Sequence, residues 1–229
     1  TTFNIANAGE TLTISGVISG AGGPAVSGNG TLVLSGNNTF TGATTIASGS
    51  TLIAAANNAL GTTAGATTIT NGGTLGFQGG FTYGTVEPVT VNGAGVASAG
   101  AMLNVSGSNS FAGNLTIGSA STFGSSAGSL TISDDFTNAG SLVTATGAGN
   151  LGLSGAISGA GGLTKNGSGT LTLSGGSDKT FSGATTVNDG VLALNMTADR
   201  DAFAGTLTVG DGTGAANSAV VRWMASNQQ

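Results

Sequence analysis

Two long stretches of this chain carry nearly the same sequence. The hexapeptide ISGAGG occurs at residues 18–23 and again at 157–162, so its two starting positions differ by 157 − 18 = 139. The segments GTLVLSG at 30–36 and GTLTLSG at 169–175 keep the same offset. Blocks that recur in one order and one register predict a repeat protein, whose units must stack on their neighbours to bury a core.

A third block shows where the repeat tolerates change. GATT at 42–45 recurs at 183–186, where the offset is 183 − 42 = 141, so the second copy has gained two residues before this block. The insertion falls in GGSDKT at 175–180. We interpret this segment as a surface turn, because surface turns accept insertions without disturbing their flanks.

The local pattern predicts β-strands. The chain contains 44 Gly together with many Thr, Ser and Asn, which are mid-range to poor helix formers. Short alternating apolar and polar runs, bounded by Gly and Asn, are typical of strands and turns. Two apolar residues spaced two apart face the same side of a strand, which we expect to be the core. The predicted pairs are Leu12/Ile14, Leu32/Leu34, Leu75/Phe77, Leu103/Val105, Leu115/Ile117, Leu130/Ile132, Leu151/Leu153, Leu171/Leu173, Leu192/Leu194 and Leu207/Val209.

Short strands with tight Gly and Asn corners favour an all-β fold, a right-handed parallel β-solenoid (β-helix) of roughly ten coils, about 50 Å long at the usual strand spacing. We predict that residues 1–229 form one solenoid that is a segment of a longer chain. Its long repeat copies lie at about 9–61 and 149–205, and its divergent coils at about 78–148. A β-sandwich is the alternative, and it would predict hairpin turns without long-range self-similarity.

Four phenylalanines stand at related places in the repeat. Phe40 and Phe181 precede TGATT and SGATT, while Phe111 and Phe203 precede AGNLTI and AGTLTV. We interpret them as filling the coil interior near a corner. The alternative is a set of exposed stacking platforms for sugars.

The composition argues against catalysis. The chain has no Cys and no His, which removes thiol nucleophiles, thiolate metal sites and imidazole chemistry. The close acid groupings are Asp134–Asp135 and Asp199/Asp201, and no second acid recurs beside either at a coil-related spacing. We therefore interpret the acids as solvated turn residues and predict no enzyme and no catalytic, cofactor-binding or metal-binding residue. The acids are Glu10, Glu87, Asp134, Asp135, Asp178, Asp189, Asp199, Asp201 and Asp211.

The charge pattern also limits the partners. The cations are Lys165, Lys179, Arg200 and Arg222, too few for a nucleic-acid footprint. No apolar run approaches the ~20 residues of a membrane-spanning helix. We therefore expect neither nucleic-acid binding nor membrane insertion by this segment, and its opening stretch TTFNIANAGE lacks the pattern of a signal peptide.

The second copy, GGLTKNGSGTLTLSGGSDKTFSGATTVNDGVLAL at 161–194, resembles the passenger-associated transport repeat, also called the autotransporter-associated β-strand repeat. The first copy at 20–54 is similar, but it has PAVSGN at 24–29 where the family has a Leu-Thr-Lys-x-Gly pattern. The tail at 210–229 resembles a phrase that follows these repeats. The resemblance implies a β-helical passenger region, secreted or on the bacterial cell surface, that acts as scaffold and names no ligand.

Three function classes follow from this reading. The first is a structural β-solenoid, a stalk or adhesin-type passenger. Neither end looks like a polar cap, so we expect the strands at the ends to pair with flanking coils of the same polypeptide or to stack end to end into filaments. The second is a module that binds glycans or receptors, or ice, through a Thr/Ser/Asn lateral face; ice would require a flat Thr-x-Thr array. The third and most remote is a polysaccharide-degrading β-helix enzyme.

Overall fold

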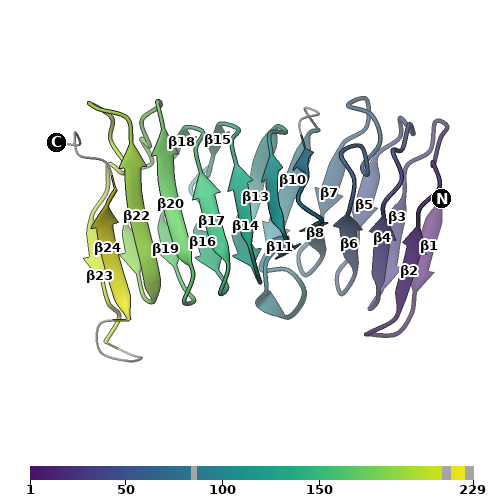
Figure 1. Ribbon diagram of the computed structural model, residues 1–229, viewed down its shortest axis with the longest axis horizontal. Helices are drawn as coiled ribbons and strands as arrows, with labels where there is room; N and C mark the ends of the chain where they lie inside the picture. The colour runs from purple at the N-terminus through teal and green to yellow at the C-terminus, as the bar shows by residue number, and fades with distance from the viewer. Residues whose placement is uncertain (84–86, 213–217, 225–229) are drawn as a thin grey trace.

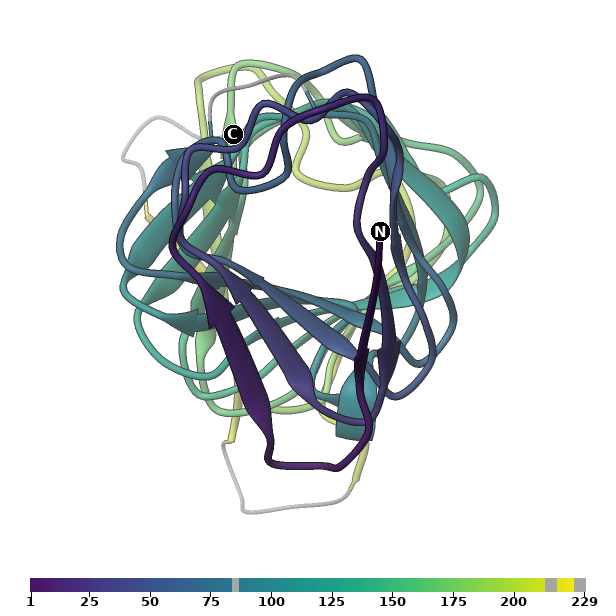
Figure 2. The same ribbon diagram turned by 90° about the vertical axis from the view of Figure 1, so that its right-hand side faces the viewer.

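The chain winds into a parallel β-solenoid of about nine turns (Figure 1). It is a computed structural model, and it describes residues 1–83, 87–212 and 218–224. Seen from the N-terminal end, the chain runs clockwise as it recedes from the viewer, which is a right-handed winding (Figure 2). The predicted all-β, right-handed parallel β-solenoid is confirmed, and the number of turns is close to the roughly ten coils expected.

Each coil visits three sides of the rod in turn, which we call sides one, two and three. Side one is formed by β1 (Thr2–Ile5), β3 (Ala25–Gly28), β5 (Thr44–Ile46), β7 (Thr67–Ile69), β10 (Val89–Gly93) and the start of β13 (Leu115–Ser125), followed by β15 (Phe136–Thr137) and β18 (Ile157–Ser158). Side two is formed by β2 (Thr11–Ile14), β4 (Thr31–Leu34), β6 (Thr51–Ala54), β8 (Thr74–Gln78), β11 (Met102–Ser106), the end of β13, β16 (Val143–Thr146), β19 (Leu163–Lys165), β21 (Thr185–Val187) and β23 (Leu207–Val209). Side three is formed by β9 (Thr82–Tyr83), β12 (Ser108–Phe111), β14 (Ser129–Ile132), β17 (Asn150–Leu153), β20 (Thr170–Gly175), β22 (Gly190–Met196) and β24 (Ala219–Trp223).

The two long repeat copies do not lie on the same sides. GTLVLSG of the first copy supplies β4 on side two, whereas GTLTLSG of the second copy supplies β20 on side three. Counting along side two, β19 lies six strands, and so six coils, beyond β4. The chain then passes from β19 on side two to β20 on side three. The offset between the copies is therefore six coils and one side, and the second copy is rotated about the rod axis by one side.

Most of the predicted apolar pairs form the core. Seven of the ten pairs are buried along both their residues, from Leu32/Leu34 to Leu192/Leu194, and the two pairs nearest the ends of the rod are partly exposed. The pair Leu103/Val105 is wrong, because Met102 and Asn104 point inward on β11 instead. Met102 stacks between Leu75 and Phe123, and this register turns Leu103 and Val105 outward.

The corner phenylalanines fill the interior, as predicted. Phe40, Phe111 and Phe181 are buried, and Phe203 is half-buried against the same core. The interpretation of GGSDKT as a surface turn is only partly right. Gly176 and Ser177 are exposed, but Lys179 is fully buried.

Candidate functional surface

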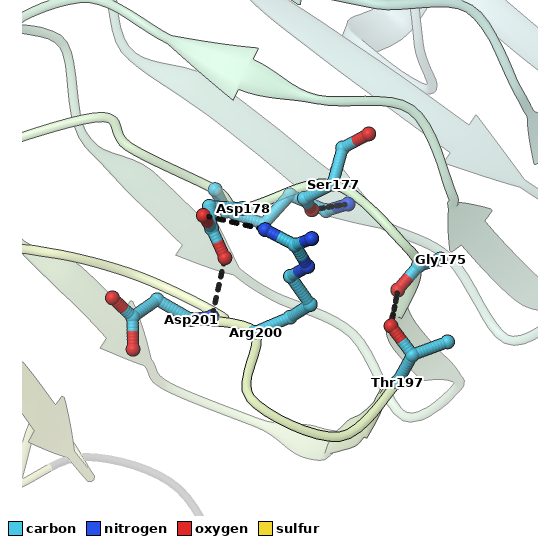
Figure 3. A network of polar contacts seen from close by, with 7 residues as sticks. Gly175, Ser177, Asp178, Thr197, Arg200 and Asp201 are labelled. Carbon is cyan, nitrogen blue, oxygen red and sulfur yellow. Dashed lines mark hydrogen bonds and ion pairs between the residues drawn. The ribbon is translucent and has the colours of Figure 1, made fainter.

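A corner on side one of the second copy holds a polar network (Figure 3). Asp178 accepts a hydrogen bond at its Oδ1 from the backbone N–H of Asp201 at 2.9 Å. Its Oδ2 lies 3.4 Å from Nη1 of Arg200, and both side chains are substantially exposed. Thr197 donates from its Oγ1 to the carbonyl of Gly175 at 3.3 Å. An exposed ion pair of this length stabilises the fold by about 0–1 kcal/mol.

Acidic residues of different coils lie along the same corner, contrary to the sequence expectation. The register Phe136↔Ile157↔Lys179 places Asp135 and Asp178 two coils apart on one line. The carboxylate of Asp135 accepts a hydrogen bond from the backbone N–H of Ala156 at its Oδ1, at 2.6 Å. These carboxylates bind neighbouring backbone N–H groups and serve the stacking of coils.

The Asp199/Asp201 pair does not share a strand face. Asp199 has a φ of 61° in an irregular turn, and both residues lie outside the strands. Among the described residues no group of three or more acids is placed to hold a metal ion, and no helix is long and apolar enough to cross a membrane.

Lys179 lies inside this corner as a buried ammonium group. It donates from Nζ to the carbonyls of Ser154, Ser174 and Ser177, at 3.4, 2.7 and 3.3 Å. Burial lowers the pKa of Lys179 to about 8, although Asp135 and Asp178 oppose the shift. In the register that aligns the two GATT blocks, its counterpart in the first copy is Asn38.

Asn38 performs the same task without a charge. It is buried, accepts the backbone N–H of Ile18 at 2.8 Å and donates to the carbonyl of Ala59 at 2.7 Å. One amide thus joins the coil before to the coil after. The lysine at the equivalent corner joins backbone groups through three donors instead.

A second lysine, Lys165, is buried on side two between Ala145 and Val187. Its Nζ donates to the carbonyls of Asn166, Gly167 and Asp189. Burial lowers the pKa of Lys165 to about 8, partly opposed by the charge of Asp189.

The first copy closes this corner with an apolar residue and a hydroxyl group. In the register that aligns the two ISGAGG blocks, Val26 is the counterpart of Lys165, and it is also buried. The carbonyl of Gly28, which corresponds to Gly167, accepts a hydrogen bond from Ser50 Oγ at 2.9 Å. The charged group is therefore one of two solutions to the same corner, and general rules for lysine, which place it on the surface, did not reveal it.

One acid departs from the predicted solvated turns. Glu87 is only 1% exposed. Its Oε1 accepts a hydrogen bond from Thr67 Oγ1 at 2.9 Å, and its Oε2 has no hydrogen-bond partner among the described residues. Burial raises the pKa of Glu87 to about 7, and the bond from Thr67 opposes this shift.

One line of threonines runs along the whole of side two, and we call it the threonine line. Strand register places one of its residues in each of ten successive coils, and nine of the ten are threonine. They alternate with inward residues such as Leu32 and Leu52, so they belong to the outer surface of the strands. The line consists of Thr11, Thr31, Thr51, Thr74, Ala101, Thr122, Thr144, Thr164, Thr186 and Thr208.

The middle of the threonine line is covered. Thr74 donates from Oγ1 to the carbonyl of Gly100 at 2.9 Å and accepts the backbone N–H of Val96 at 2.8 Å. The covering loop contains the short 3₁₀ turn η1 (Val96–Ser98). Hydroxyl groups are therefore presented in two stretches, one on either side of this loop.

The second outward line on side two is mostly not threonine. Beside the line, Thr13 is followed in register by Val33, Ile53, Gly76 and Leu103. The flat Thr-x-Thr array that ice binding would require is not formed on this side.

The fold defines a class, the parallel β-solenoid built from a sequence repeat. Within that class, a model of the passenger-associated-transport-repeat matches residues 26–54 and 163–194. The resemblance drawn from the two long copies is thereby confirmed, and the family implies a secreted or cell-surface passenger. No curated protein and no solved structure matches the chain. The resemblance of the tail at 210–229 lies partly outside the described residues and stays a prediction.

Proposed function

We propose that this chain is a shaft segment of an extracellular or cell-surface passenger, a non-catalytic stalk of the adhesin type. The observation that carries the proposal is the side-two ladder, which continues through ten strands from β2 to β23. A ladder of this kind holds its shape along the whole rod, because each coil hydrogen-bonds to the next. The match to the passenger-associated-transport-repeat supports the secreted or surface location.

A shaft tolerates the loss of a whole coil. Residues 143–162 form one such coil, since Val143 is in register with Leu163. Deleting them should shorten the rod by about 4.8 Å and keep the β-sheet circular dichroism. Small-angle X-ray scattering measures the length, and a deletion variant that unfolds would contradict the proposal. Antibody labelling of intact bacteria tests the location, and labelling only after lysis would contradict it.

For the partners we propose further β-coils that pair with the open edges of the rod. Among the described residues β1, β2, β23 and β24 each have a paired strand on one edge only. Leu12 and Val209 belong to an inward line, yet they are 41% and 49% exposed in these end coils. Flanking coils of the same polypeptide, or another copy stacked end to end, would cover them. Electron microscopy of the purified chain tests the second arrangement, because only stacking gives filaments.

The threonine line favours a second candidate, a glycan- or receptor-binding lateral face. Its test is a glycan array probed with the protein and with a variant that carries Thr144→Val, Thr164→Val and Thr186→Val. The matched control replaces Thr131 and Thr172 by Val on side three. Binding that survives the first variant, or an array without any hit, would contradict this candidate for glycans.

A further inference from the structure

Glu87 stands on a corner line where the neighbouring coils have glycine. The register of β7, β10 and β13 places it beside Gly65 and Gly113. A carboxyl group therefore enters a corner that the two neighbouring coils leave without a side chain. The Thr67 hydroxyl is the hydrogen-bond donor to this carboxyl, and the second carboxyl oxygen is buried without a partner among the described residues.

Within residues 1–83, 87–212 and 218–224, no cation forms an ion pair with this carboxyl group. The titratable group that faces it is the buried phenol of Tyr83, whose pKa is raised by burial and, to a smaller degree, by the charge of Glu87. In the described residues the ion pair joins Arg200 and Asp178, and both lysines donate to backbone carbonyls of the second copy, away from Glu87 in the chain. An ionised Glu87 would thus be a buried charge with one hydroxyl donor, which is costly, whereas the protonated acid is neutral.

We infer that the solenoid is built to be more stable in mildly acidic surroundings than at neutral pH, through the buried carboxyl group of Glu87. The folded-state pKa is raised from 4.5 to about 7. Between these values the folded chain binds more protons than the unfolded chain, so stability rises as the pH falls. For this shift the unfolding equilibrium constant at pH 5 is about fortyfold smaller than at pH 7. Most proteins lose stability on acidification, because their carboxylates are paired in the folded state.

Carboxyl carbon NMR of the folded chain tests the inference directly. The chain contains two glutamates, Glu10 and Glu87, so labelling glutamate with ¹³C gives two carboxyl signals. The Glu87 signal is the one that disappears in the Glu87→Gln variant, and we expect it to titrate near neutral pH. Titration of the Glu87 signal between about pH 4 and 5 would overturn the inference.

Urea unfolding at pH 5 and pH 7 gives the second test. The wild type should show the fortyfold difference, and Glu87→Gln should lose it, because the amide keeps the shape and does not titrate. Asp135→Asn, an exposed corner acid, is the control and should keep the difference. A wild type that is less stable at pH 5 than at pH 7, or a Glu87→Gln variant that keeps the difference, would overturn the inference. If Glu87→Gln does not fold, the NMR titration of the wild type decides.

Discussion

Replacing Lys165 by Met should remove a pH dependence on the alkaline side of neutrality. The pKa of Lys165 falls from 10.5 to about 8 on folding. Between these values the unfolded chain binds more protons than the folded chain, so the contribution of Lys165 to stability rises as the pH rises. From pH 7 to pH 9.5 this amounts to about a thirtyfold fall in the unfolding equilibrium constant, or about 2 kcal/mol for one lysine. Lys179 has a similar shift, so the wild type should gain about twice as much.

At pH 7 the substitution should be nearly neutral. Keeping the ammonium charged in the interior costs about 3 kcal/mol, because burial lowers its pKa from 10.5 to about 8. Losing the hydrogen bonds to three carbonyls costs about 1 kcal/mol each, so the two effects offset to within about 1 kcal/mol. The buried Val26 at the same place in the first copy shows that the corner closes without an amine.

Urea unfolding followed by circular dichroism at pH 7 and 9.5 measures both effects. The upper pH lies below the ordinary pKa of tyrosine, so Tyr83 stays mostly neutral in both states. We expect Lys165→Met to keep about half of the alkaline gain of the wild type. A variant that keeps the whole gain, or one that loses more than about 3 kcal/mol at pH 7, would refute the reasoning.

Three further predictions concern the packing of coils. A Cβ on Gly183 would lie 2.4 Å from the backbone of Gly161, so Gly183→Ala should lower the free energy of unfolding in urea by about 1–3 kcal/mol. Gly16 has open space around it, so Gly16→Ala should cost far less. Equal losses would contradict the stacking geometry. Phe181→Ala should cost about 3–5 kcal/mol because the ring is fully buried, and a loss below about 1 kcal/mol would favour the sugar-platform interpretation. Both lysines should resist an amine-reactive label in the folded chain and react after unfolding, as mass spectrometry of labelled peptides would show; rapid labelling of Lys165 or Lys179 in the native state would contradict their burial.

The sequence was sufficient to predict the repeat, the strands and the coil corners, because each depends on residues close together in the chain. GTLVLSG and GTLTLSG became strands, and Phe40 and Phe181 became interior residues, as expected. The threonine line was not predictable in this way, because successive members are a whole coil apart in the chain and only the strand register aligns them.

The buried ionisable groups escaped prediction for another reason. Composition rules place Lys and Glu on the surface, and they apply to the average position in a protein. Lys165 and Lys179 are exceptions because several carbonyl groups converge where their side chains end. A comparison of the two copies could have indicated that both lysines are buried. Their counterparts in the first copy are Val26 and Asn38, residue types that occur in interiors and corners.

The rotation between the copies determines which surface a long partner can follow. Corner loops of the first copy and the equivalent loops of the second project from different sides of the rod, because the copies are six coils and one side apart. A flat partner that contacts a corner loop of the first copy therefore does not contact the equivalent loop of the second copy. Side two is different, since it is built of strands in both copies and one ladder joins β2 to β23. A partner that extends along the rod would thus be expected to bind side two, where the threonine line lies.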